Sequence, residues 1–213
     1  MRSFLMTFIF LSLFSLTSLA VENADPSPAS VGPQQAVKAV ESCLNGISTL
    51  RARFVQTAND GKKLTGIFYL KRPGKMRFQY DPPDTDFIVA DGLFVYYYDG
   101  QMKQQSNAPV SNSLANFFLR KNITLGGDIS VSDVRRVNGM LQMALVQTRN
   151  PLAGSLILTL TENPLQLRKW QVVDAQGLIT EVALQNIETG ITLDNDLFHY
   201  YDPALKAGAY KQN

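Results

Sequence analysis

The sequence predicts an α+β protein that is mostly antiparallel β, with a single large sheet and two helical segments laid on it. Three observations support this fold class. Short runs rich in apolar and aromatic residues follow one another closely from residue 49 onward. Turn signals such as "NDG", "RPG" and "YDG" separate the runs. The intervals are too short for crossover helices, so neighbouring strands are expected to pair antiparallel.

The beginning of the chain predicts a secretory signal peptide at residues 1–20. Met1-Arg2 is a short positive end, and "FLMTFIFLSLFSLTSLA" follows it without a charged residue. Small residues at Ser18 and Ala20 suit signal peptidase, so cleavage is expected after Ala20. The alternative is an uncleaved membrane anchor, although the apolar run is near the short end of what spans a bilayer. Residues 21–32 are expected to be a flexible lead-in to one domain at residues 33–213.

The single cysteine, Cys43, bears on the location of the mature protein. A lipoprotein signal would place a cysteine directly after the cleavage site, and Cys43 lies more than twenty positions downstream. A lone cysteine also forms no internal disulfide in an oxidising compartment. We therefore expect a soluble exported protein, with Cys43 as a small buried residue on the apolar face of a helix.

Size and charge narrow the possible functions. Removal of the signal peptide leaves about 190 residues, enough for one domain with a sizeable core. Only Arg2 is lost from the charged residues, which leaves 19 basic against 18 acidic residues and a net charge of +1. This balance, together with export, argues against a nucleic-acid-binding protein.

The first helix is predicted from Pro33, because apolar residues then recur at three- and four-residue steps up to Ile47. Pro33 suits a first turn and Gly46 lies near the end. Strands are expected at residues 49–58, 63–72, 75–80, 86–90, 93–98, 101–105, 128–137, 140–148, 154–161, 165–174 and 178–188. Between the sixth and seventh, the segment "APVSNSLANFFLRKN" fits a short helix.

Two of the strands are apolar on both faces. In "GIFYLKR" and "LFVYYYD" neither set of alternate residues is polar, whereas a sheet exposed on one side alternates more cleanly. Either helices cover one face while the sheet curls to bury the other, or a concave face forms an apolar pocket. Periodicity alone does not separate these arrangements.

The sequence contains few candidates for catalysis. It has one histidine, His199, and no nucleophile elbow, phosphate-binding loop or dinucleotide fingerprint. One histidine with one cysteine does not supply a metal site. Carboxylates such as Asp81, Asp91 and Asp99 lie beside turn residues, where aspartate commonly initiates turns. We therefore predict that the protein is not an enzyme and has neither a cofactor nor a metal.

A helix, then "LRARFVQT", then "LTGIFYLKRPGKMRFQYDPPDTDFIVADGLFVYYYD" resembles the periplasmic outer-membrane lipoprotein carrier family, LolA. The resemblance covers roughly residues 33 to 203 and is densest between Leu50 and Asp99. Its specific elements are Phe54 with Gln56, Gly66, the Lys71-Arg72-Pro73 corner before a basic-aromatic strand, Pro83, and the Val89-Ala90-Asp91-Gly92 turn.

The resemblance implies a single curved sheet that forms an unclosed half barrel, with helices as a lid over its apolar concave face. It also implies a carrier of the acyl chains of lipoproteins. The partners would be the acylated cargo, an inner-membrane ABC transporter that releases it, and an outer-membrane receptor. A monomer without a nucleic-acid partner is expected.

By the same resemblance, Arg72 would bond to the lid helices and hold the empty cavity closed, although a solvated cation at a strand end is the alternative. Met76 would lie near the cavity mouth, or else simply in the core. Lys71, Lys75 and Arg77 are expected to face solvent or a partner. The candidate residues for the acyl-chain cavity are Leu50, Phe54, Phe68, Leu70, Met76, Phe78, Phe87, Val89, Phe94, Tyr96, Leu114, Phe117 and Phe118.

The sequence departs from the LolA family pattern at two places, and two other functions are considered. Leu114 stands where many relatives carry a proline near the start of the lid, and the sequence after Pro203 diverges. A periplasmic lipid- or protein-sensing module with the same half barrel is the first alternative function. A secreted hydrolase is the second, and it would need a nucleophile and base or two opposed carboxylates.

Overall fold

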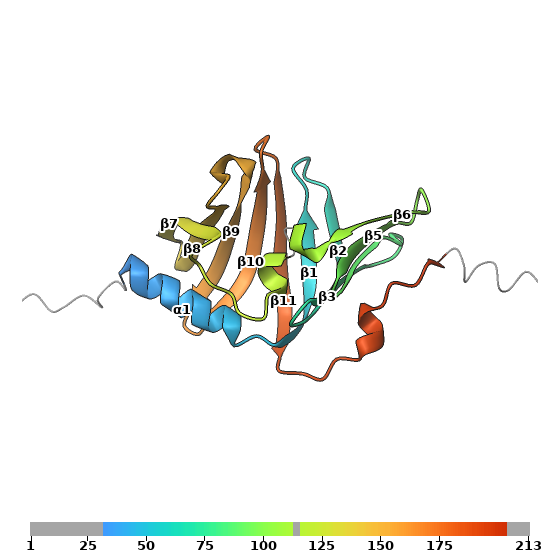
Figure 1. The fold of residues 1–213 in the computed structure, drawn as a ribbon, viewed down its shortest axis with the longest axis horizontal. Coiled ribbons are helices and arrows are strands. Elements are labelled where there is room, and N and C mark those ends of the chain that lie inside the picture. The colour runs from blue at the N-terminus through green and yellow to red at the C-terminus, as the bar shows by residue number, and fades with distance from the viewer. Residues whose placement is uncertain (1–31, 113–115, 204–213) are drawn as a thin grey trace, which may run out of the picture. The chain divides into compact units, whose positions relative to one another are not determined.

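A computed structural model describes residues 32–112 and 116–203. The predicted signal peptide at residues 1–20 lies outside the described residues. So do the lead-in up to residue 31, the lid residue Leu114, and the end of the domain beyond residue 203. The described residues form a curved sheet with helical segments on its faces (Figure 1).

Eleven strands pair antiparallel in one unclosed sheet, which confirms the predicted fold class. The strand order is β6-β5-β4-β3-β2-β1-β11-β10-β9-β8-β7, so two meanders join where the first strand pairs with the last. The strands are β1 (Thr49–Thr57), β2 (Lys63–Lys71), β3 (Lys75–Tyr80), β4 (Phe87–Asp91), β5 (Phe94–Asp99), β6 (Gln104–Pro109), β7 (Ile129–Val137), β8 (Met140–Gln147), β9 (Gly154–Glu162), β10 (Leu165–Asp174) and β11 (Ile179–Thr189).

The helical segments are short except for α1 (Pro33–Asn45), which begins at Pro33 as expected and is followed by Gly46. Its buried residues, Ala36, Val40 and Leu44, form one stripe that packs against the sheet. The others are η1 (Val110–Asn112), α2 (Asn116–Leu119), η2 (Pro151–Ala153) and η3 (Asn195–Phe198). Figure 1 shows α1 and α2 across the same face of the sheet. No helix in the described part of the chain is long and apolar enough to cross a membrane.

Strand register divides the side chains between two faces of the sheet. Leu50 lies opposite Leu70, and Phe68 lies opposite Phe78. These residues belong to the same buried cluster as the α1 stripe, so we call their side of the sheet the helix face. The alternate residues of β1 to β5, among them Arg77, form the outer face.

The outer face has a smaller core of its own. Phe87, Val89 and Tyr98 are buried there, and Tyr96 and Tyr200 pack against them. Tyr200 belongs to the segment after β11, so the C-terminal part of the chain covers this face of β4 and β5. This cover explains why the outer side of these two strands is apolar.

Gly66 is required by close packing on the helix face. It lies opposite Phe54 on one side and Tyr80 on the other. A Cβ at this position would lie 2.6 Å from Cε1 of Phe54 and would collide with the carbonyl oxygen of Gln79. We expect Gly66→Ala to lower the free energy of unfolding by about 1–3 kcal/mol, the usual cost of overpacking a core. Urea unfolding measures this, with Lys63→Ala at an exposed position of the same strand as control; equal stabilities would contradict it.

Asp81 predicts how stability depends on pH. Its carboxylate accepts hydrogen bonds from Arg53, at 2.9 Å for Nη1 to Oδ1, and from the Thr65 hydroxyl at 2.6 Å. These bonds lower the pKa of Asp81 to about 2. A lowered pKa stabilises the fold fully above the unfolded value, near 3.9, and that contribution is lost as the pH falls toward the folded value. The stability difference between the wild type and Asp81→Asn should therefore be constant near neutrality and shrink between about pH 4 and pH 2. Unfolding measured across this range tests it, and a difference that does not change with pH would contradict it.

Candidate functional site

The helices and the loop after α2 form one cover over the helix face. The side-chain amide of Asn45, at the end of α1, donates to the carbonyl oxygen of Ile123 at 2.9 Å and accepts from its N–H at 2.8 Å. The N–H of Leu125 donates to the carboxylate of Glu41. We call α1 together with residues 110–112 and 116–125 the lid, because these contacts join α1 to the loop after α2.

The turn between β2 and β3, residues 72–74, holds the C-terminal ends of both helices. The Arg72 guanidinium donates through Nη2 to the carbonyl oxygen of Leu44 in α1. The N–H of Gly74 donates to the carbonyl oxygen of Leu119, the last residue of α2, at 2.8 Å. Helix C-termini leave carbonyl groups without intrahelical partners, and this turn supplies donors to one such group from each helix.

Arg72 is only partly satisfied in this position. Its Nε and Nη1 are buried and have no hydrogen-bond partner among the described residues. Burial also lowers the pKa of the Arg72 side chain. A buried donor without a partner costs free energy, so Arg72 stabilises the closed lid less than a fully bonded arginine would.

Aromatic contacts join the lid to the middle of the sheet. Phe118 of α2 packs on Trp170 of β10, with 4.9 Å between ring centroids. Trp170 in turn contacts Phe68 at 5.6 Å, and Phe68 contacts Phe78 at 4.5 Å. The sequence analysis did not select Trp170, because the predicted strand gave no reason to prefer one of its faces.

Most of the predicted cavity residues lie together under or within the lid. The sheet contributes Leu50, Phe54, Phe68, Leu70, Met76 and Phe78, and the lid contributes Phe117 and Phe118. Apart from Phe118, which is half-buried, none of these side chains is more than 8% exposed. In this conformation they are therefore sealed, and an apolar ligand could reach them only if the lid moved.

The other predicted cavity residues do not join this group. Val89 lies opposite Arg77 and Tyr96, and Phe87 lies opposite Tyr98, so Phe87, Val89 and Tyr96 are on the outer face. Phe94 is two residues before Tyr96 on β5 and therefore lies on the same face, with 6.2 Å between the ring centroids. Leu114 is outside the described residues. The cavity hypothesis is therefore restricted to the helix-face group.

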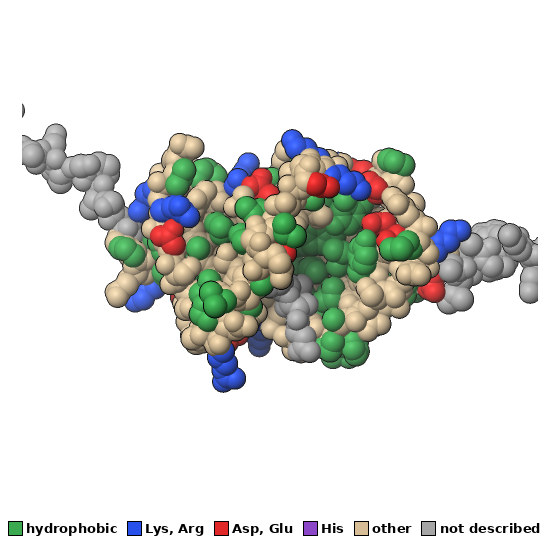
Figure 2. All heavy atoms as spheres, turned by 90° about the horizontal axis from the view of Figure 1, so that it is seen from above, with side chains coloured by type: hydrophobic (Ala, Val, Ile, Leu, Met, Phe, Trp, Pro, Cys, Tyr) green, Lys and Arg blue, Asp and Glu red, His purple; other side chains and the backbone are tan. Residues whose placement is uncertain are grey.

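A hollow adjoins the sealed group. Figure 2, which views the structure from above Figure 1, shows a recess lined by hydrophobic side chains on the side where β1–β6 lie. On β4 and β5 the helix face carries Ile88, which lies opposite Phe78, and Tyr97, which lies opposite Ile88. Tyr97 is 40% exposed, and Ile88 and the neighbouring Val95 are half-buried. These three residues are not among the cavity residues predicted from sequence, because both faces of β4 and β5 are apolar and the sequence does not show which face lies under the lid.

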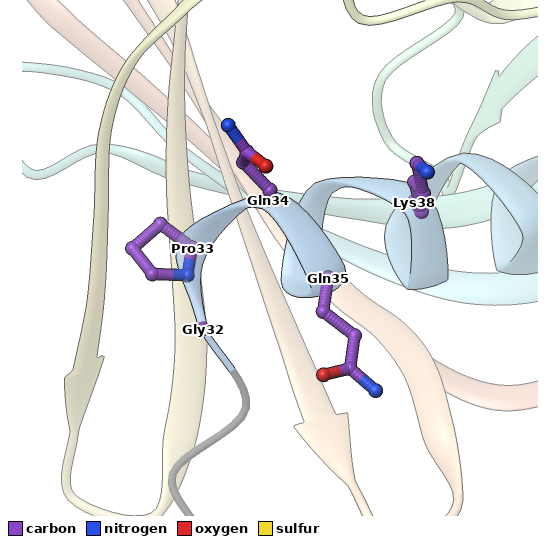
Figure 3. A pocket seen from close by; sticks show the side chains of 5 residues that line it. All are labelled: Gly32, Pro33, Gln34, Gln35 and Lys38. Atoms are coloured by element: carbon purple, nitrogen blue, oxygen red, sulfur yellow. The ribbon is translucent and has the colours of Figure 1, made fainter.

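Two other concavities lie on the described part of the chain. One, of about 460 Å³, lies at the first turn of α1 and is lined by Gly32, Pro33, Gln34, Gln35 and Lys38. Figure 3 shows Gln34 and Lys38 on one side of the helix and Gln35 on the other, so their polar groups do not converge. The second, of about 280 Å³, is on the outer face and is lined by Arg77, Phe87, His199, Tyr201 and Pro203.

Asp91 and Asp99, two of the carboxylates that the sequence places beside turns, have structural roles there. Asp91 accepts hydrogen bonds from the N–H groups of Leu93 and Phe94, and Asp99 accepts from that of Gln101. Within the described ranges, no group of three or more histidine, cysteine or acidic residues could hold a metal ion. The arrangement suits shelter of an apolar ligand better than acid–base chemistry.

The cations of β2 and β3 on the outer face form hydrogen bonds with a later segment of the chain. Lys71 and Lys75 donate to the Asn195 side chain, and Arg77 donates to the carbonyl oxygen of Leu197. All three cations are half-buried, so the expectation that they face solvent is met only in part, and contact with a partner stays a prediction. Their hydrogen-bond acceptors lie 120 to 124 residues further along the chain, a separation that local sequence patterns do not reveal.

Comparison with known proteins places these features in a family. Residues 45–201 match the family described as outer membrane lipoprotein carrier protein LolA. An outer-membrane lipoprotein carrier protein of Methylococcus capsulatus is 30% identical over 84% of this chain and 88% of its own length. One from Nitrosomonas europaea is 26% identical over 79% and 85%, respectively. Among solved structures, a LolA superfamily protein from Nitrosomonas europaea matches with a TM-score of 0.43 and 9% identity, covering 77% of this chain and 97% of that one.

Proposed function

The chain belongs to the outer membrane lipoprotein carrier family LolA, a family of carriers and not of enzymes, and we propose that it carries lipoproteins through the periplasm. It would accept their acyl chains from an inner-membrane ABC transporter and deliver them to an outer-membrane receptor. The predicted signal peptide supports a periplasmic location.

The observation that carries this proposal is the apolar helix face beneath a lid whose two helix ends depend on one turn. Transfer of an acyl chain from the membrane into water costs roughly 0.8 kcal/mol of free energy for each methylene, on the order of 10 kcal/mol for a long chain. A carrier must offset this loss with apolar surface. The half-buried or exposed helix-face side chains of Ile88, Val95 and Tyr97 would make the first contact with an acyl chain, and movement of the lid would add the sealed residues.

We further propose that Arg72 is the latch of the closed, empty state. Its bond to Leu44 and the neighbouring bond from Gly74 to Leu119 support this role. Opening the lid would break these bonds, and that cost would offset part of the gain from burying acyl chains. The carrier would thereby hold its cargo reversibly, which allows release at the outer membrane without nucleotide hydrolysis.

The carrier function predicts that substitution of two isoleucines affects lipoprotein binding differently. Ile88 is a half-buried residue on the helix face of β4, whereas Ile67 is a half-buried residue on the outer face of β2. We expect Ile88→Asn to weaken binding of a triacylated lipoprotein roughly 5- to 30-fold, the equivalent of about 1–2 kcal/mol of lost apolar contact. Ile67→Asn should bind as the wild type does. Native mass spectrometry after incubation with inner-membrane vesicles that carry transporter and lipoprotein would measure the one-to-one soluble complex. If wild-type protein forms no complex while a known carrier does, the carrier function is refuted.

Removal of the latch predicts trapping of cargo. Arg72→Leu deletes a hydrogen bond from a charged donor, worth roughly 1.5–3 kcal/mol, so the open, loaded state should be favoured about 10- to 100-fold. Transfer of preloaded lipoprotein to receptor-bearing vesicles should fall accordingly. The matched control is Arg51→Leu, which removes an exposed arginine paired with Glu188 on the outer face. Normal transfer by Arg72→Leu would rule out the latch role.

A further inference from the structure

The segment after β11 crosses the outer face of the sheet as a strap. We call residues 190–200 the C-terminal strap. It starts at β1, where the N–H of Gly190 donates to the carbonyl oxygen of Thr49 and the Thr49 hydroxyl donates to that of Ile191 at 2.8 Å. It ends over β5, where Tyr200 stacks on Tyr96 with 4.9 Å between ring centroids and 13° between ring planes.

Cations from β2 and β3 hold the middle of the strap. The Lys71 ammonium donates to the carbonyl oxygen of Leu193 at 2.9 Å and to Oδ1 of Asn195 at 2.8 Å. Lys75 and Arg77 add longer contacts of 3.4 Å to Asn195 and to the carbonyl oxygen of Leu197, respectively. Hydrogen bonds from a charged donor are short and strong, so Lys71 is the principal anchor.

The strap is packed as part of the fold. The side chain of Phe198 is 1% exposed and that of Leu193 is 8% exposed. Tyr200 also contacts Phe87, at 5.8 Å between ring centroids. Displacing the strap would therefore uncover apolar surface on the outer face as well as break the bonds to Lys71.

The anchor of the strap and the donors to the lid lie on the same hairpin. Lys71 pairs with Lys75 in the register of β2 and β3, and residues 72–74 are the turn between them. Arg72 is the next residue after Lys71, so one peptide unit separates a side chain fixed to the strap from a side chain fixed to α1. The two contacts lie on opposite faces of the sheet. A change in the position of this turn must affect both.

We propose that Lys71 is a positioning residue for Arg72, and that the strap regulates the lid through the β2–β3 turn. With the strap in place, the turn presents its donors to the ends of α1 and α2. Displacement of the strap lets the turn shift and the lid open. The coupling is reciprocal, so opening of the lid also loosens the strap by the same factor. The proposal relies on the proposed function only where it treats the helices as a lid.

Cys43 provides a native probe of lid opening in the empty protein. It is the single cysteine of the chain and lies on α1, where its thiol donates to the carbonyl oxygen of Leu165 in β10 at 3.3 Å. Burial raises the pKa of the Cys43 thiol, so the closed state holds it in the unreactive protonated form. Its rate of labelling by a maleimide therefore reports separation of α1 from β10.

The test compares Lys71→Met with Lys63→Met, which removes an exposed ammonium from the other end of the same strand. Lys71→Met keeps the apolar stem and should speed labelling of Cys43 about three- to tenfold, whereas Lys63→Met should leave the rate unchanged. Arg72→Leu should speed labelling as well. Because Lys71 acts through Arg72, the double variant should label no faster than Arg72→Leu, whereas independent effects on stability would multiply.

Hydrogen exchange on the same proteins guards against general destabilisation. Lys71→Met should raise exchange in the strap, α1 and α2 while β8 and β9 keep their protection. Faster exchange in the strap with unchanged labelling of Cys43 would overturn the proposal, and so would multiplicative rates in the double variant. The assay contains no lipid, so its failure leaves cargo binding at Ile88 untouched, and failure of cargo binding leaves the coupling intact.

Discussion

The turn at residues 72–74 is the constraint on which the arrangement of the lid depends. Two helices that are distant in sequence end beside it, and each directs a carbonyl group of its last turn toward one of its donors. A cation at a helix C-terminus also suits the negative end of the helix dipole. Gly74 has a φ of +84°, and a Cβ there would lie 2.9 Å from Cα of Gly92. Lys71, Arg72 and Gly74 therefore each meet a local requirement.

The sheet is apolar on both faces of β4 and β5 for two different reasons. On the helix face the lid packs on β7 and β10, and Ile88 and Val95 of β4 and β5 pack against the same core cluster. On the outer face the C-terminal strap buries a separate aromatic cluster. Much of the apolar surface is thus used in packing, whereas on the helix face of β4 and β5 Tyr97 is 40% exposed and Ile88 and Val95 are half-buried. A small accessible area beside a sealed one suits a ligand that enters as the cover moves.

The strands could be predicted from the sequence because each one is short, regular and bounded by turn residues. The sixth was displaced, found at Gln104–Pro109 and expected at residues 101–105, since an exposed edge strand carries no apolar alternation. The faces were harder. Phe78 and Phe87 look alike in sequence, and only the register across residues 81–86 shows that they point to opposite sides. Contacts at great separation, such as Lys71 with Leu193, leave no local pattern at all.

The lid and the strap together suggest how a weakly closed state is obtained. A fully bonded, buried arginine would hold the lid strongly, and loading would then require a large differential affinity for the open state. Arg72 instead leaves two buried donor groups without partners among the described residues, which limits what closure gains. Packing of the strap on the outer face compensates, because it fixes the turn without adding contacts inside the site. The free energy of closure is then set outside the surface that meets the cargo, so it can be adjusted without altering how acyl chains are bound.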